Sequence, residues 1–146
     1  MTRILLAITL TASLVACQAG KPPEGLPGNA QDTAPYAGIA ADETVRFVGT
    51  EPFWGGSVSS GTLIYTTPER PDGDRIAVER FAGRGGVSWT GNLRGSRFAL
   101  AVTPGVCSDG MSDRTYPFVA TLEVEGGQQN GCGWTEKMPF SGPENP

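Results

Sequence analysis

From Thr44 onward, apolar and polar side chains alternate with a period of two, which is the pattern of half-buried β-strands. Val45 and Phe47 alternate with Thr44 and Arg46. In the clearest run, residues 118–125, one face is wholly apolar and the other carries threonine and glutamate. Similar runs predict further strands at 54–59, 62–66, 75–81, 87–93 and 97–103.

Turn-forming residues separate these runs. Ser60-Gly61 predicts a tight hairpin, and residues 83–86 and 93–97 predict further reversals. Residues 68–74 predict a turn or loop in which Asp72-Gly73 supplies a positive φ. Because no amphipathic helix interrupts the pattern, we expect an all-β fold, a small antiparallel barrel or sandwich of about seven to eight strands. The β-domain is predicted to span residues 43–133, which is enough chain for one core.

The first residues have a different pattern. One cation, Arg3, precedes an apolar run at 4–16, which would span only about 20 Å as a helix, against about 30 Å for the hydrocarbon core of a bilayer. This indicates a signal peptide over residues 1–16. Leu14-Val-Ala-Cys17 resembles the lipobox of bacterial lipoproteins, which implies that Cys17 carries acyl chains such as palmitate. The alternative is an uncleaved anchor.

Residues 17–42 are predicted to be the lipidated cysteine and a flexible tether, because apolar residues there follow neither strand nor helix periodicity. In an alternative interpretation, Tyr36 and Ile39 pack onto the domain. We expect a lipid-anchored protein of the bacterial cell envelope that faces the periplasm. Gln18, in place of an aspartate that retains some lipoproteins in the inner membrane, favours the outer membrane.

Composition narrows the possible chemistry. The chain has 11 basic and 15 acidic residues, and cleavage before Cys17 removes only Arg3, so the mature net charge is −5. Nucleic-acid binding is therefore not expected. Histidine is absent, which removes the commonest general base and transition-metal ligand. We expect a protein that is not an enzyme and has no cofactor.

The three cysteines have different expected roles, which their positions in the chain indicate. With Cys17 assigned to the lipid, Cys107 and Cys132 remain as a pair in an oxidising compartment, which favours a disulfide. Such a bond would stabilise the fold by about 3 kcal/mol. The competing interpretation is a reactive or metal-binding thiol pair.

Two segments are candidates for binding. In the first, residues 47–54, a strand ends near Gly49 and the chain re-enters structure with adjacent aromatics. Phe53 and Trp54 must point to opposite sides of an extended chain, so one can fill the core while the other faces a rim or pocket. Glu51 is the best-placed carboxylate beside them. The structural alternative is a closed barrel mouth with Glu51 capping backbone amides.

The second segment, residues 107–117, is a polar loop that begins at a cysteine. Asp109, Ser112 and Asp113 bring oxygen atoms together, and Tyr116 follows them. A hard cation could use such oxygens, but the spacing is not that of a calcium loop, and we expect no metal. The structural alternative is an Asx-type turn in which both aspartates bond nearby amides and Arg114 pairs with a carboxylate.

Both segments also carry a family resemblance. The motifs GTEPFW (49–54) and CSDGMSD (107–113), together with Phe47, Tyr65-x-x-Pro68, Tyr116-Pro117 and Gly131-Cys132, resemble an uncharacterised family of bacterial envelope lipoproteins. Its members occur beside META-type, HslJ-like domains. The resemblance covers residues 43–133 and implies an envelope location, a small β fold and the Cys107–Cys132 disulfide, with no catalytic set. Residues 134–146, predicted as an irregular tail, depart from the family outline.

Several functions follow as hypotheses. The leading one is non-enzymatic binding of an envelope protein or a small ligand by a face of Glu51, Phe53, Trp54 and the loop 108–116. A purely structural or stress-related envelope role is the main alternative. Less favoured are an inhibitor of lysozyme-like proteins, on fold-level analogy, and a hydrolase that pairs Glu51 with Asp109 or Asp113.

Overall fold

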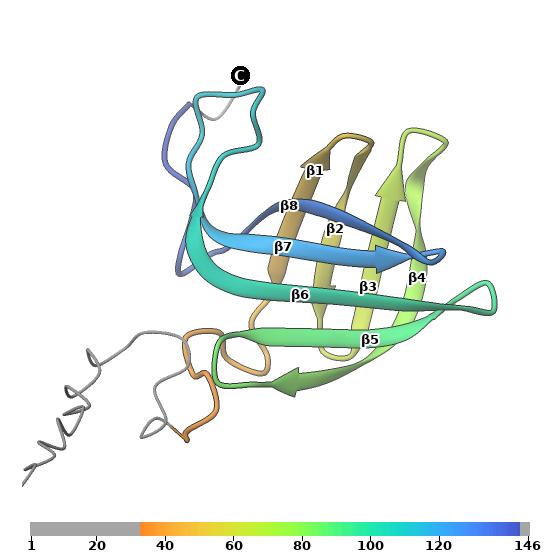
Figure 1. Cartoon of the computed structure of the whole chain (residues 1–146), viewed down its shortest axis with the longest axis horizontal. Coiled ribbons are helices and arrows are strands. Elements are labelled where there is room, and N and C mark those ends of the chain that lie inside the picture. The colour runs from red at the N-terminus through yellow and green to blue at the C-terminus, as the bar shows by residue number, and fades with distance from the viewer. Residues whose placement is uncertain (1–32, 144–146) are drawn as a thin grey trace, which may run out of the picture.

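The computed structural model describes residues 33–143 and confirms the all-β prediction. Eight antiparallel strands in chain order close into a barrel, with the first strand paired to both the second and the last (Figure 1). No helix occurs within residues 33–143. The strands are β1 (Val45–Thr50), β2 (Phe53–Ser59), β3 (Thr62–Thr67), β4 (Arg70–Ala82), β5 (Val87–Leu93), β6 (Ser96–Cys107), β7 (Tyr116–Val124) and β8 (Gly127–Thr135).

The alternation of apolar and polar residues along each strand determines which side chains fill the barrel. Successive residues of a strand point to opposite faces, so each strand sends its apolar set inward. An eight-stranded barrel is just wide enough for such side chains to fill it. The buried residues include Phe47, Trp54, Leu63, Trp89, Phe98, Leu100, Phe118 and Leu122.

The last strand, β8, has no apolar alternation and was not predicted. Its partners in β7 place Gln129, Gly131 and Gly133 on the inward face, opposite Leu122, Ala120 and Phe118. The Trp54 ring and the Val48 carbonyl occupy the space in front of Gly131. The pattern of β8 is therefore complementary to its neighbours, and the sequence of the strand alone does not show it.

Three boundaries also differ from the prediction. The expected turn at 68–74 is confined to Pro68-Glu69, and Gly73, with φ 79°, lies inside β4 near a register shift. Strand β6 continues to Cys107 through a second irregularity after Pro104. Residues 134–135 belong to β8 and not to an irregular tail. Strand pairing across the sheet extends these elements past their turn-forming residues.

The segment before β1 packs against one end of the barrel. Ile39 is fully buried, and its carbonyl accepts a hydrogen bond from the Arg80 guanidinium at 2.7 Å. The Tyr36 amide donates to the Gly83 carbonyl at 2.7 Å. The alternative in which Tyr36 and Ile39 pack onto the domain is the one observed. The predicted signal peptide, Cys17 and the predicted tether up to residue 32 lie outside the described residues.

A carboxylate fastens this segment to the end of β8. Glu43 accepts a hydrogen bond from the Ala40 amide at 3.2 Å and lies 3.5 Å from the Lys137 ammonium. Burial alone would raise the pKa of Glu43, but hydrogen bonds from the Thr135 hydroxyl and the Ala40 amide, together with Lys137, lower it.

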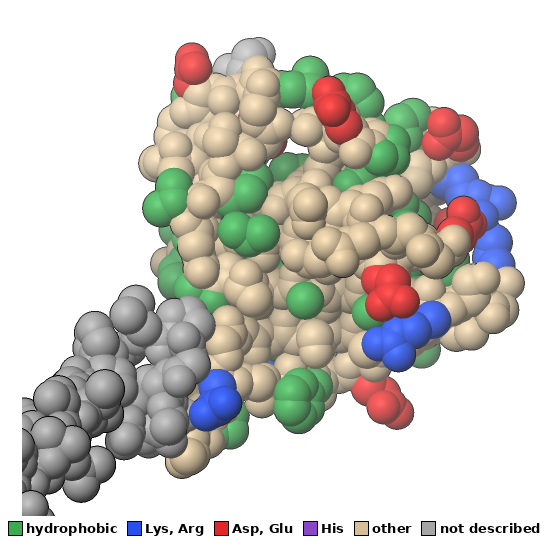
Figure 2. Space-filling view, in the orientation of Figure 1, with side chains coloured by type: hydrophobic (Ala, Val, Ile, Leu, Met, Phe, Trp, Pro, Cys, Tyr) green, Lys and Arg blue, Asp and Glu red, His purple; other side chains and the backbone are tan. Residues whose placement is uncertain are grey.

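The opposite end of the barrel is polar. Asp74 forms ion pairs with Arg70, at 3.3 Å, and with Arg94 beside a hollow of about 320 Å³. Acidic and basic side chains gather on this side of the molecule, where the β5–β6 and β7–β8 turns lie (Figure 2). Such exposed pairs contribute little to stability, so this end is chiefly a solvated rim.

Candidate functional site

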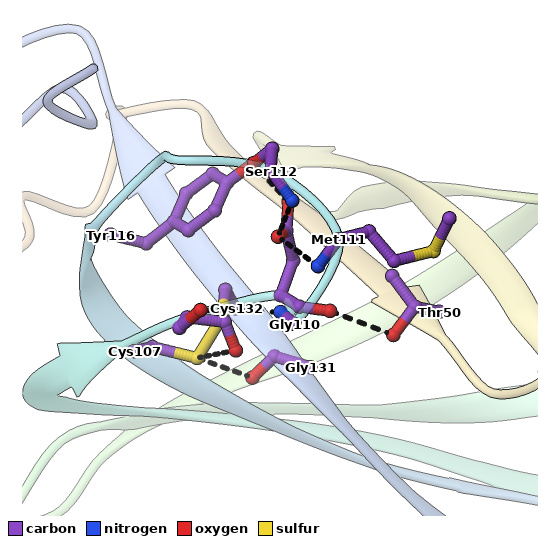
Figure 3. Close-up of a disulfide and its surroundings, with 10 residues drawn as sticks. Thr50, Cys107, Gly110, Met111, Ser112, Tyr116, Gly131 and Cys132 are labelled. Carbon is purple, nitrogen blue, oxygen red and sulfur yellow. Dashed lines mark hydrogen bonds between the residues drawn. A yellow bond between two sulfur atoms is a disulfide. The ribbon is translucent and has the colours of Figure 1, made fainter. Parts of the chain in front are cut away.

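The two sequence segments meet in space. After Pro104, the hairpin of β6 and β7 leaves the barrel, and a disulfide between Cys107 and Cys132 ties it to β8, with Cα atoms 5.6 Å apart (Figure 3). The loop at its tip, residues 108–115, is called the Asp109 loop below. The Thr50 hydroxyl donates to the Asp109 carbonyl at 3.0 Å, so the loop lies beside the β1–β2 turn (Figure 3). The predicted disulfide is confirmed.

The Asp109 carboxylate organises its own loop. One oxygen accepts hydrogen bonds from the amides of Met111 at 3.0 Å and Ser112 at 2.8 Å. The other accepts from the hydroxyls of Ser112 at 2.7 Å and Tyr116 at 3.1 Å. Partial burial raises the pKa of Asp109, but these four donors outweigh it and lower the pKa to about 2. The Asx-type turn is confirmed for Asp109.

Aromatic rings support the same loop. Tyr116 is buried, with ring centroids 5.4 Å from Trp134 and 5.6 Å from Phe140. Arg114, predicted to pair with a carboxylate, donates to the Pro143 carbonyl at 2.8 Å and lies 4.6 Å above the Phe140 ring. Asp113 is exposed. Tyr116, predicted as a binding residue, is thus buried and supports the loop through Asp109.

Trp54, predicted as part of a binding face, is only 4% exposed, so most of its ring is packed inside the barrel. Its indole covers two glycines, and a Cβ at Gly49 or Gly131 would lie 2.1 Å and 2.9 Å, respectively, from ring atoms of Trp54. The motif residues Gly49, Trp54 and Gly131 therefore form one packing unit at the end of the barrel.

Phe53 points the other way, as the adjacent aromatics predicted, and is 53% exposed. Glu51, in the turn before it, is exposed as well. In Figure 3, the side chain of Met111 extends past Thr50, which is the register partner of Phe53. Of the predicted face, Glu51, Phe53, Met111 and Asp113 are exposed.

Below Phe53 lies a groove on the outside of the barrel, called the β2 groove below. Its floor is the outward face of β2, where Gly55 and Ser57 follow Phe53 at every second position. Register places Arg46 and Val48 of β1 on one side of this floor. The groove has a volume of about 620 Å³. The other wall and the ends are formed by Ile64, Thr66, Thr67 and Pro68 of the β3 side and by Trp134 of β8.

The two neighbouring glycines of β2 differ in how much space they leave for a side chain. A Cβ at Gly56, which does not belong to the floor, would lie 1.8 Å from the Ile64 carbonyl oxygen, so a side chain there is excluded. At Gly55 the nearest atom, the Phe47 carbonyl oxygen, would be 3.2 Å away, so a methyl group needs only a small shift. Small residues at 55 and 57 thus leave an open channel between two walls.

Arg46 is the single charged residue that lines the β2 groove. Within residues 33–143, no hydrogen bond or ion pair involves its guanidinium. A second hollow, of about 320 Å³, adjoins the groove at Arg46 and Trp134 and is also lined by Glu136 and Phe140. The groove therefore combines aromatic walls with one unpaired cation.

Sequence reasoning missed Arg46, Ser57 and Trp134 as members of one surface. The outward position of Arg46 and Ser57 follows from the alternation, but their adjacency follows from the β1–β2 register. Trp134 joins them only through the β1–β8 pairing, in which it lies opposite Arg46. The available signal was the pair of small outward residues, Gly55 and Ser57, that follows the outward Phe53 in β2.

Among residues 33–143, no group of three or more acidic, cysteine or histidine side chains is arranged to hold a metal ion. In the same part of the chain, no helix has the length and apolarity to span a bilayer. Comparisons with protein-family models, with curated proteins and with solved structures found no match.

Proposed function

We propose that this protein is a lipid-anchored module of the cell envelope that binds a partner or a small ligand, without catalysing a reaction, through the β2 groove. The observation that carries the proposal is an outer-surface groove of about 620 Å³ that contains an exposed Phe53, Trp134 and Arg46, which has no partner within residues 33–143. Exposed aromatic and arginine side chains are frequent binding anchors.

The hydrogen bonds of Asp109 favour binding over hydrolysis. Both carboxylate oxygens accept from donors of the same loop. A lowered pKa of about 2 also disfavours Asp109 as a general acid, which must hold a proton near neutral pH. These contacts support a role in holding the loop over one in which Glu51 pairs with Asp109.

In this proposal, Cys17 carries the lipid and residues 18–32 connect it to the packed segment that begins near Tyr36. Fully extended, fifteen residues reach about 50 Å. Such a link would let the domain reach partners at some distance from the membrane. We place it in the periplasm, on the outer membrane by preference, in agreement with the resemblance to envelope lipoproteins.

Crosslinking in cells that express the full chain tests the groove. Ser57→Phe fills the floor with a ring on the outside of the barrel, and a phenylalanine is well tolerated in a strand. Ser88→Phe is the matched control, since Ser88 lies on β5, three strands away from β2. We expect a crosslinked partner with the wild type and Ser88→Phe and its loss with Ser57→Phe at equal abundance. Equal recovery from all three would overturn the groove as the binding site and favour a purely structural role.

The anchor has a separate test. Cys17→Ser should abolish metabolic labelling with palmitate and release the protein from membranes. Continued labelling, or retention in the membrane fraction, would contradict lipid attachment at Cys17. Because the described barrel does not include Cys17, the variant is expected to keep the thermal stability of the domain.

A further inference from the structure

If the β2 groove is a binding site, its chemistry also restricts the ligand, and this inference rests on the proposed function. We infer that the groove takes a small apolar carboxylate, whose apolar body lies along β2 between the walls of β1 and β3 while its carboxylate pairs with Arg46.

The charge of the groove points to an anion. Arg46 has no partner within residues 33–143, whereas Arg70 and Arg94 are paired with Asp74, and Arg97 lies 3.5 Å from Glu123. The planar guanidinium matches a carboxylate through two parallel hydrogen bonds. A phosphate would bring more charge and more acceptor oxygens than one arginine among apolar walls can satisfy. One carboxylate is therefore the best electrostatic complement.

The position of Arg46 makes it accessible to such a ligand. Its register partners are Ser57 of β2 on one side and Trp134 of β8 on the other. Arg46 and Trp134 both line the groove, and Arg46 is exposed. Glu136 lines the adjoining hollow and not the β2 groove, so no carboxylate of the groove lining competes with the ligand.

Main-chain pairing argues against an extended peptide as the ligand. Peptides that add a strand need an unpaired sheet edge. Here β1 pairs with β8 and β2, β2 with β1 and β3, and β3 with β2 and β4. The floor and both walls therefore lack a sheet edge, and recognition must come from side chains.

The dimensions fit a small molecule. Small-molecule sites have volumes of about 300–1,000 Å³, and the groove has about 620 Å³. From Phe53 to Ser57, four residues along a strand, the floor is about 13 Å long. Apart from Arg46, its long side chains are apolar: Val48, Phe53, Ile64, Pro68 and Trp134. An aromatic or aliphatic monocarboxylate of about this length would cover them.

Calorimetry with the mature chain in lipid nanodiscs tests the inference, with empty nanodiscs as the blank. The probes are 4-phenylbutyrate and 4-phenylbutyramide, which has the same body without the charge. We expect saturable binding of the acid, at least tenfold weaker binding of the amide, and an affinity for the acid that falls roughly 10- to 100-fold in Arg46→Gln, as for the loss of one charge-assisted hydrogen-bonded pair. Arg97→Gln, the control with the same charge change, should bind like the wild type.

The outcomes separate this inference from the proposed function. Equal binding of acid and amide that is lost in Ser57→Phe would overturn the carboxylate but retain the groove. Absence of binding by either probe, with a crosslinked partner still sensitive to Ser57→Phe, would also overturn the inference alone. Acid binding that survives both Arg46→Gln and Ser57→Phe would place the ligand elsewhere and remove support from both proposals.

Discussion

The Asp109 loop and the β2 groove are neighbours at the end of β1, but they differ in whether their charged group has hydrogen-bond partners. In the loop, one carboxylate receives four hydrogen bonds from its own segment, and a disulfide ties the segment to β8. In the groove, Arg46 has no partner among the described residues, and Phe53 is half exposed. Saturated polar groups stabilise a fold, whereas an exposed cation without a partner in the described chain is available to a ligand.

Trp54 and Phe53, adjacent residues of β2, differ in the same way, because one belongs to the packed core and the other to the groove. Trp54→Ala should lower the free energy of unfolding by about 3–5 kcal/mol, because it removes a buried ring that covers Gly49 and Gly131. Phe53→Ala should change it by about 1 kcal/mol or less, since about half of the side chain is in solvent and its truncation leaves no cavity in the core. Urea denaturation of the two variants measures both values. Similar losses would mean that the outer ring also belongs to the core.

Removing the disulfide should produce the next largest effect. Cys107→Ser together with Cys132→Ser opens a loop with a sequence separation of 25 and should cost about 3 kcal/mol. It should also raise amide hydrogen exchange at Met111 and Ser112, which are held only while the Asp109 loop stays folded. Unchanged protection there would show that the hydrogen bonds alone keep the loop in place.

Acid should weaken the Asp109 loop in a defined pH window. Because the pKa of Asp109 is lowered from 3.8 to about 2, its ionised form stabilises the folded state above about pH 4, and this stabilisation is lost as pH falls towards 2. Asp109→Asn should lower stability at pH 7 by about 1–2 kcal/mol, allowing for solvent screening, and flatten the acid dependence. Unfolding curves between pH 2 and 7 measure this.

Two features sharpen that experiment. Asp113→Asn is the matched control, since Asp113 is exposed, and we expect the wild-type pH profile from it. The pKa of Glu43 is also lowered, so part of the acid dependence should remain in Asp109→Asn. A wild-type profile from Asp109→Asn would contradict the role of the carboxylate as the centre of the loop.

The groove variants should have the smallest effect on stability. Ser57→Phe and Arg46→Gln change outward side chains without a hydrogen bond or ion pair among the described residues, so we expect changes within about 0.5 kcal/mol. Thermal unfolding followed by circular dichroism measures this. A large loss of stability in either variant would mean that the groove, like the loop, is part of the structural framework.

Much of the fold could be predicted because strand alternation is local. The strands around Val45, Trp89, Phe98 and Leu122 follow from a period of two within each run. The strand β8 was missed for the same reason, since its inward Gly131 faces the ring of Trp54 from β2, a contact that its own local sequence does not show.

The sequence by itself determined that the chain forms antiparallel strands and that Phe53 and Trp54 lie on opposite faces, and it favoured the bond between Cys107 and Cys132 that the structure confirms. Only the tertiary structure decided which aromatic is inside, that Asp109 reaches Thr50, and that Arg46 lies between Ser57 and Trp134. The physical reason is that the face of a residue depends on its own strand, whereas its neighbours depend on the register between strands that are far apart in the chain.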